Sequence, residues 1–185
     1  KGYTAAVEAV LDARDKGELK GVHGTIAELA TVKQEYEAAL GVAAGGRMQS
    51  IVVDNDESAA ACINYLKQKK IGRAIFLPLN KMLQGRPSGK ALMSVKDPAS
   101  LGYAMELVKF KEEYKAAFWF VFGDTIVVKH LDTLRKLMGG VRLVTLDGDL
   151  AEPSGAMIGG TPEQSMLKFG APSPTEQKKV GVLLK

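Results

Sequence analysis

Residues 143–160 read LVTLDGDLAEPSGAMIGG. The run at 143–146 is short and apolar, which is typical of a buried strand. The Asp-Gly pair at 147–148 is turn chemistry, because glycine accepts positive φ angles and aspartate bonds its own downstream backbone. The glycines that follow leave a bare backbone beside apolar residues, as at a strand edge paired with a second chain. Spacing alone favours a plain glycine-rich loop, so both interpretations stay open.

Four segments, in this order along the chain, resemble the hinge domain of SMC (structural maintenance of chromosomes) proteins. They are residues 21–29 (GVHGTIAEL), 72–79 (GRAIFLPL), 122–128 (FGDTIVV) and the glycine-rich run at 143–160. Each segment is weak evidence alone, but the ordered set is specific.

The resemblance implies an α+β (mixed α/β) fold of two small subdomains with mixed sheets, flanked by stubs of a coiled coil. The expected boundaries are 1–20 for the incoming arm, 21–98 and 99–170 for hinge subdomains I and II, and 171–185 for the returning arm. A weak internal repeat agrees with this. Two strand–helix–strand units are predicted, with strands at 51–53 and 74–77 and again at 126–128 and 143–146.

Local patterns predict several further elements. Residues 1–16 have helical spacing, and Thr25 with Glu28 forms a capping box. The acidic run at 54–58 lacks the glycine and distant glutamate of a calcium loop, and it is interpreted as a helix start. Residues 104–108 are predicted to be extended.

The charge distribution is uneven. The net charge is +4, yet residues 67–96 hold eight basic and no acidic residues. Such a block repels itself unless it is spread over a surface or faces a polyanion. A solvated face and a DNA-binding face are both open on charge alone. The candidate phosphate contacts are Lys67, Lys69, Lys70, Arg73, Lys81, Arg86 and Lys90.

Membrane and disulfide chemistry have little support. The longest apolar run, 116–122, is far shorter than the roughly 18 residues of a membrane span. Cys62 is the single cysteine, so no intrachain disulfide or cysteine-rich metal site is possible, which fits a reducing compartment.

No catalytic or metal site is predicted. His23 and His130 are the only histidines and belong to no nucleophile motif. The loop from Gly85 to Lys90 departs from a phosphate-binding P-loop, because only three residues separate its glycines and Ala91 follows the lysine. No strand clearly precedes this loop and no helix clearly follows it. The aromatic run Phe118–Phe120 is interpreted as core packing rather than a base-stacking platform.

The resemblance implies a homodimerising hinge that joins two coiled-coil arms of a chromosome condensation and segregation ATPase, associated with the nucleoid in the cytoplasm. DNA is a second expected partner, and accessory subunits are expected to bind elsewhere. ATP and magnesium are expected only at a separate head domain, so no cofactor and no enzyme activity are expected here. The predicted dimer interface is Gly155, Met157, Ile158, Gly159 and Gly160, facing strand edges of the first subdomain.

Two rival functions remain open. One is a small α/β nucleotide- or phosphate-binding enzyme that uses the Gly85–Lys90 loop. The other is a monomeric nucleic-acid-binding module whose Phe118–Phe120 run stacks on bases.

Overall fold

The computed structural model describes residues 2–161 and 167–170, which form two compact units. Of the described residues, unit 1 contains 2–30, 46–82 and 167–170, and unit 2 contains 31–45 and 83–161. The predicted α+β class is confirmed, because both units combine helices with sheets that have parallel and antiparallel pairs.

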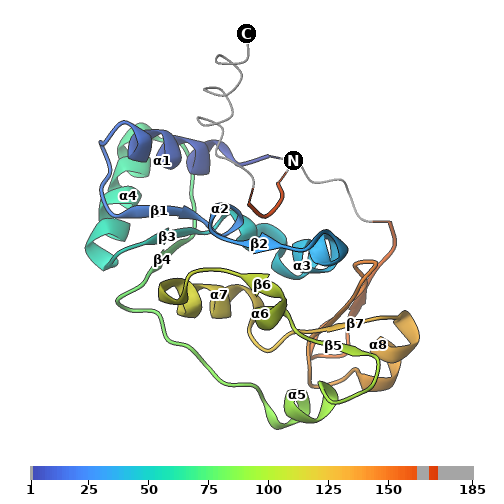
Figure 1. Cartoon of the computed structure of the whole chain (residues 1–185). Helices are drawn as coiled ribbons and strands as arrows, with labels where there is room; N and C mark the ends of the chain where they lie inside the picture. The colour runs from blue at the N-terminus through green and yellow to red at the C-terminus, as the bar shows by residue number, and fades with distance from the viewer. Residues whose placement is uncertain (1, 162–166, 171–185) are drawn as a thin grey trace. The chain divides into compact units, whose positions relative to one another are not determined.

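Unit 1 is built on a three-stranded sheet in the order β1-β3-β4. Strand β3 (Ile51–Val53) is central, antiparallel to β1 (Val22–Thr25) and parallel to β4 (Phe76–Pro78). Helices α1 (Ala5–Asp15) and α4 (Asp56–Lys69) pack on this sheet and on each other (Figure 1). Their apolar faces and the strands share one core.

Helix α1 is part of this core rather than a separate arm. It buries Ala6, Val7, Val10, Leu11 and Ala13, so its apolar face is used within unit 1. The short helix α2 (Ile26–Leu29) begins at the predicted capping box, in which Glu28 N–H donates to Thr25 Oγ1 over 3.1 Å and Thr25 N–H donates to Glu28 Oε1 over 3.0 Å.

Unit 2 is built on a five-stranded sheet in the order β10-β9-β8-β7-β5. Its strands are β5 (Ser100–Tyr103), β7 (Ile126–Val128), β8 (Leu143–Thr145), β9 (Leu150–Ala151) and β10 (Met157–Ile158). Only β7 and β8 are parallel. Helices α5 (Gly89–Ser94) and α8 (Leu131–Leu137) contribute Ala91 and Leu134 to its core.

The segment 31–45 belongs to unit 2, which moves the expected subdomain boundaries. Strand β2 (Thr31–Val32) pairs with β6 (Val108–Lys109), and α3 (Glu37–Ala44) packs on α7 (Lys115–Phe122) and β8. Short 3-10 turns η1 (Gln34–Tyr36) and η3 (Glu112–Tyr114) precede the two helices, and η2 (Gly45–Gln49) follows α3. Because these pairings are non-local, a division of the chain at residue 98 does not follow the packing.

The internal repeat is longer than the sequence pattern suggested. Apart from η2, which has no counterpart between α7 and β7, the order β1-α2-β2-η1-α3-β3-α4-β4 recurs as β5-α6-β6-η3-α7-β7-α8-β8. Residues 33–45 (KQEYEAALGVAAG) align with residues 111–123 (KEEYKAAFWFVFG). Helix α6 (Ala104–Leu107) lies in the stretch predicted to be extended, so that prediction was wrong for residues 104–107, whereas Val108 is in strand β6. In the repeat, α6 is the counterpart of α2.

In both repeats the longer of the first two α-helices ends at a glycine, Gly45 after α3 and Gly123 after α7. Gly45 has φ 54° and ψ −138° after α3, and Gly123 has φ 51° and ψ −134° after α7. A Cβ at Gly45 would meet nothing within 4 Å, so only backbone conformation demands glycine there.

We expect Gly45→Ala to lower the free energy of unfolding by about 1–2 kcal/mol, since a side chain disfavours this region of φ/ψ space. The matched control is Gly41→Ala in the same helix, where the space is open and φ is not positive. That change is expected to raise stability by about 0.5–1 kcal/mol. Urea unfolding measures the free energy of unfolding of both variants. Equal changes in the two variants would contradict the proposed role of backbone conformation at Gly45.

Candidate interaction surfaces

Strand β10 is an open edge of the unit 2 sheet. Among the described residues it pairs only with β9, as Met157 opposite Ala151 and Ile158 opposite Leu150. Both of its side chains stand in solvent, with Met157 50% and Ile158 57% exposed. The predicted interface residues therefore lie on one hairpin whose outer edge has no partner within the described residues.

The backbone of β10 presents specific groups at that edge. The Ala156 carbonyl accepts a hydrogen bond from Glu152 N–H over 2.8 Å, which orients it toward β9. Amide groups alternate between the two sides of an antiparallel strand. The N–H and C=O of Met157 consequently point away from β9 and are available to another strand.

The three glycines of the predicted interface have reasons for being glycine inside the chain. Gly155 and Gly160 have φ angles of 95° and 125°, which favour glycine. A Cβ at Gly159 would lie 2.5 Å from Asp149 Oδ1. Close approach of a partner's backbone is thus not the only explanation for glycine at these three positions. Mutations here are also expected to affect the hairpin itself.

Strand β4 is the open edge of the unit 1 sheet. The Ile75 carbonyl accepts from Ile51 N–H and Leu79 N–H donates to the Val53 carbonyl, so both point toward β3. Because successive residues of a strand direct their backbone groups to opposite sides, the N–H and C=O of Phe76 point away from β3. In the repeat, the counterpart of Phe76 is Leu143, which pairs with Ala151 of β9. Unit 1 has no counterpart of β9 among the described residues, so this position is unfilled.

Strand β1, at the other edge of that sheet, is protected. The Arg14 guanidinium donates from Nη1 to the His23 carbonyl over 3.3 Å, and its Nη2 reaches Glu28 Oε2 at 3.4 Å. A charged side chain laid on an edge strand blocks pairing with another chain. Of the two edges in unit 1, β4 is the one without a covering side chain or strand in the part of the chain that the structure describes.

The family model for the SMC proteins Flexible Hinge Domain matches residues 19–138. The chain belongs to the SMC hinge family. It is 46% identical over 143 residues to the chromosome partition protein Smc of Gloeobacter violaceus, covering 77% of this chain and 12% of that protein. The chain therefore spans about an eighth of that relative's length.

Two solved SMC hinges are similar in fold. An asymmetric dimer of the Geobacillus stearothermophilus SMC hinge domain has a TM-score of 0.81 and 38% identity, covering 100% of this chain and 73% of that one. The Pyrococcus furiosus Smc hinge domain with an extended coiled coil has a TM-score of 0.72 and 31% identity, covering 97% and 60%.

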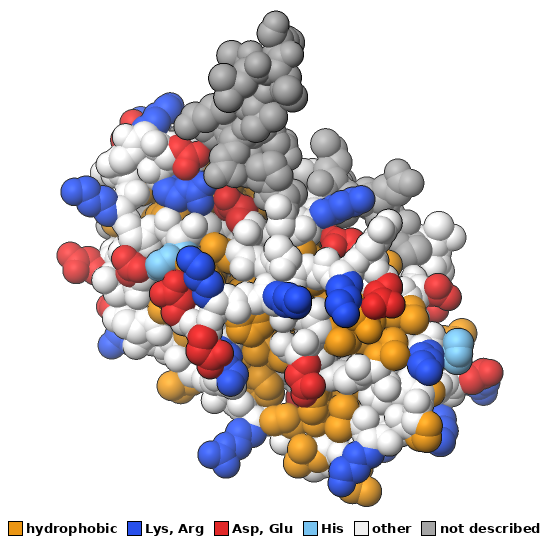
Figure 2. Space-filling model, viewed as in Figure 1, with side chains coloured by type: hydrophobic (Ala, Val, Ile, Leu, Met, Phe, Trp, Pro, Cys, Tyr) orange, Lys and Arg blue, Asp and Glu red, His pale blue; other side chains and the backbone are white. Residues whose placement is uncertain are grey.

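The seven residues of this hinge that were predicted to contact DNA are all exposed, but they are divided between the two units. Five lie in unit 1 and two, Arg86 and Lys90, in unit 2. No ion pair among residues 2–161 and 167–170 includes any of the seven, although Lys81 lies close enough to Asp56 to help lower its pKa. Figure 2 shows blue side chains interspersed with red ones on the face in view.

Three of these lysines have a structural reason to be where they are. Lys67 and Lys69 occupy the last turn of α4, and Lys70 is its C-cap. Cations there complement the negative end of the helix dipole. The ammonium of Lys69 also lies 5.9 Å from the centre of the Tyr65 ring. The basic cluster at this helix end is thus explained without a ligand, and it remains compatible with one.

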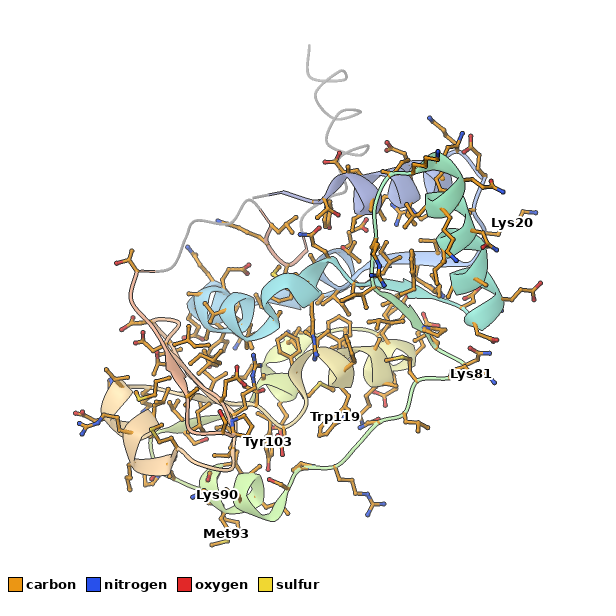
Figure 3. The ribbon with its side chains drawn as sticks, turned by 180° about the vertical axis from the view of Figure 1, so that it is seen from behind. Lys20, Lys81, Lys90, Met93, Tyr103 and Trp119 are labelled. Carbon is orange, nitrogen blue, oxygen red and sulfur yellow. The ribbon has the colours of Figure 1, made fainter. Side chains whose placement is uncertain are left out.

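The Gly85–Lys90 loop leads into a helix, contrary to expectation. Ser88 caps α5, with Ala91 N–H donating to its Oγ over 3.1 Å, and Ser88 N–H donates to Asp124 Oδ2 over 2.9 Å. A Cβ at Gly85 would lie 2.7 Å from Trp119 Nε1. Figure 3 shows Trp119 on the side of α7 that faces this loop. The glycine therefore allows the loop to cross the indole.

The acidic run at 54–58 is the predicted helix start. Asn55 caps α4, with its Oδ1 accepting from Ser58 N–H over 2.8 Å. Asp56 carries a pKa below its ordinary value, chiefly because the Asn80 amide donates to it over 2.7 Å. No group of three or more metal-ligating side chains occurs in the described part of the chain.

The titratable groups indicate structural roles. His23 Nε2 lies 2.5 Å from Asp54 Oδ1 on the surface of unit 1. Burial raises the pKa of the Cys62 thiol to about 11, which leaves it protonated and unreactive. Burial, with smaller contributions from Asp124 and Glu106, also raises the pKa of Tyr103. No helix among the described residues is long and apolar enough to cross a membrane.

Sequence reasoning missed two residues of this surface, Phe76 and Asp149. Phe76 was predicted only as part of the strand at 74–77, and its open edge becomes visible only when β4 is compared with β8 in the structure. Asp149 follows the predicted Asp147-Gly148 turn, and no sequence signal connects its carboxylate with Gly159 ten residues later.

Proposed function

We propose that this chain is a homodimerising SMC hinge in which β10 of one protomer pairs with β4 of its partner. The observation that carries the proposal is the pair of open strand edges, one in each unit. Each protomer offers one edge of each kind, so two copies form two equivalent contacts and a closed twofold assembly. The solved dimer of the similar Geobacillus hinge supports self-association of this chain.

Coiled-coil arms are expected to leave from unit 1. The described residues 167–170 return to that unit, where Gly170 N–H donates to the Ala27 carbonyl over 2.7 Å and Phe169 is buried. The extended coiled coil of the similar Pyrococcus hinge supports this arrangement. The predicted returning arm, 171–185, lies outside the described residues. In the full-length protein the hinge would thereby join two arms of a chromosome partition ATPase in the cytoplasm.

Light scattering over a dilution series tests the assembly. One chain has a mass of 19.8 kDa, so a constant mass near twice this value is expected at submicromolar concentration. A monomer at high concentration would refute homodimerisation, and only the fold relationship would remain.

Non-specific DNA binding is the second part of the proposal, supported by the exposure of all seven basic residues. Replacing Lys67, Lys69 and Lys70 by glutamine is expected to flatten the plot of log affinity against log salt by about 0.9 for each phosphate that is no longer neutralised. Fluorescence anisotropy with labelled duplex DNA measures the slope. The matched control replaces Lys109, Lys111 and Lys115, which are exposed and lie outside the basic block. An equal change in both triple variants would contradict a localised site.

The two rival functions have specific tests. Saturable binding of a nucleotide that is lost in Lys90→Ala would favour an enzyme that uses the Gly85–Lys90 loop. Quenching of Trp119 fluorescence by single-stranded DNA would favour a base-stacking module. The position of Gly85 against the indole argues against stacking, because a base would have to displace the loop.

A further inference from the structure

Asp149 is held rigidly at the turn between β8 and β9. Thr145 N–H donates to the Asp149 carbonyl over 2.8 Å, and Asp149 N–H donates to Thr145 Oγ1 over 3.0 Å. The Thr145 hydroxyl also lies 3.5 Å from Asp149 Oδ2. Since Thr145 is 1% exposed, this anchor is part of the packed interior of unit 2.

The other carboxylate oxygen faces the residues that follow β10. Asp149 Oδ1 accepts a hydrogen bond from Gly160 N–H over 3.4 Å, and it would lie 2.5 Å from a Cβ at Gly159. Gly159 does not have a positive φ angle, so its backbone conformation is open to alanine. The obstacle to a side chain at this position is therefore the carboxylate itself.

We infer that Asp149 is a positioning residue for the open edge of β10, a role that rests on the proposed β10–β4 pairing. Strand β10 has only two residues and exposed side chains, so little packing holds it in register. The carboxylate fixes the backbone just beyond the strand before a partner arrives. Ordering an edge in advance lowers the entropic cost of association.

A double-mutant cycle isolates this role. Dimer dissociation constants are measured for the parent chain, Asp149→Ala, Gly159→Ala and the double variant. Asp149→Ala is expected to weaken the dimer about 10-fold, because each of the two equivalent contacts would then carry the cost of ordering its edge, roughly 3-fold apiece. Gly159→Ala is expected to weaken it at least as much, whereas the double variant should match Asp149→Ala alone. Asp149→Asn keeps an Oδ1 acceptor and is expected to restore most of the affinity.

Three outcomes would overturn the inference. Asp149→Ala could leave the dissociation constant unchanged, or Gly159→Ala could weaken the dimer equally in both backgrounds, which would place the partner rather than Asp149 against the glycine. The third is a large fall in the unfolding midpoint when Asp149→Ala is made in the monomeric Met157→Pro background, since that would indicate a general stabilising role. A Met157→Pro chain that remains dimeric would instead refute the proposed β10–β4 pairing, so the two failures are distinguishable.

Discussion

Replacing Met157 by proline is expected to convert the proposed dimer into a monomer. The N–H of Met157 points away from β9, so its loss leaves the hairpin's own pairing intact. Proline removes this donor and places its ring against the partner strand. Each of two equivalent contacts would lose about 1–3 kcal/mol because a partner carbonyl is left unpaired, which together weakens association by roughly 10²- to 10⁴-fold.

The matched control is Met157→Ala, which removes the exposed side chain and keeps the backbone donor. If the strands associate mainly through backbone pairing, this variant stays dimeric with only a few-fold change in affinity. Sedimentation velocity over a dilution series separates the two variants, and circular dichroism checks that both retain their fold. A proline variant that sediments as a dimer would show that β10 is not the edge used.

The central strands were predictable because their sequences allow little else. Ile51–Val53 and Ile126–Val128 are β-branched triplets, fully buried and flanked by turn residues, and both were predicted to be strands. The same reasoning failed at residues 104–107, where Ala-Met-Glu-Leu is compatible with a helix or a strand. The helix begins directly after β5, and the repeat with Ile26–Leu29 is the signal that would have shown it.

The division into units could not be predicted from local pattern. Residues 31–45 follow unit 1 strands in the sequence, yet β2 pairs with β6 more than seventy residues later. Arg142 strengthens this attachment, because its Nη1 donates to the Ala43 carbonyl over 2.9 Å at the end of α3. Such contacts depend on which segments meet after folding, and no spacing rule within residues 31–45 indicates them.

The interface prediction identified a strand edge, but it explained the glycines there only by the close approach of a second chain. The structure gives Gly159 an intrachain neighbour in Asp149, and it gives Gly155 a positive φ in the turn between β9 and β10. The complementary edge at Phe76 was not named from sequence, because what marks it is a missing neighbour. Only comparison of β4 with β8, which has β9 beside it, shows that a strand position is unfilled.

Replacing Phe118 by alanine is expected to have the largest effect on stability. Phe118 is fully buried in α7, with its ring stacked 4.3 Å from the Phe110 ring and 6.4 Å from that of Phe122. Removing a buried phenylalanine ring typically costs about 3–5 kcal/mol, since it loses apolar burial and leaves a cavity. Urea unfolding followed by Trp119 fluorescence measures the loss directly in unit 2.

The control for this change is Lys111→Ala, an exposed position near the start of the same region, where an effect within about 0.5 kcal/mol is expected. The pair also decides between core packing and base stacking for the aromatic run. Core packing requires that Phe118→Ala lowers the unfolding free energy strongly and leaves DNA affinity in the folded protein unchanged. A variant of nearly parental stability that had lost its affinity for single-stranded DNA would instead assign Phe118 to a stacking platform, and the proposed hinge would then bind DNA through its aromatic residues rather than its lysines.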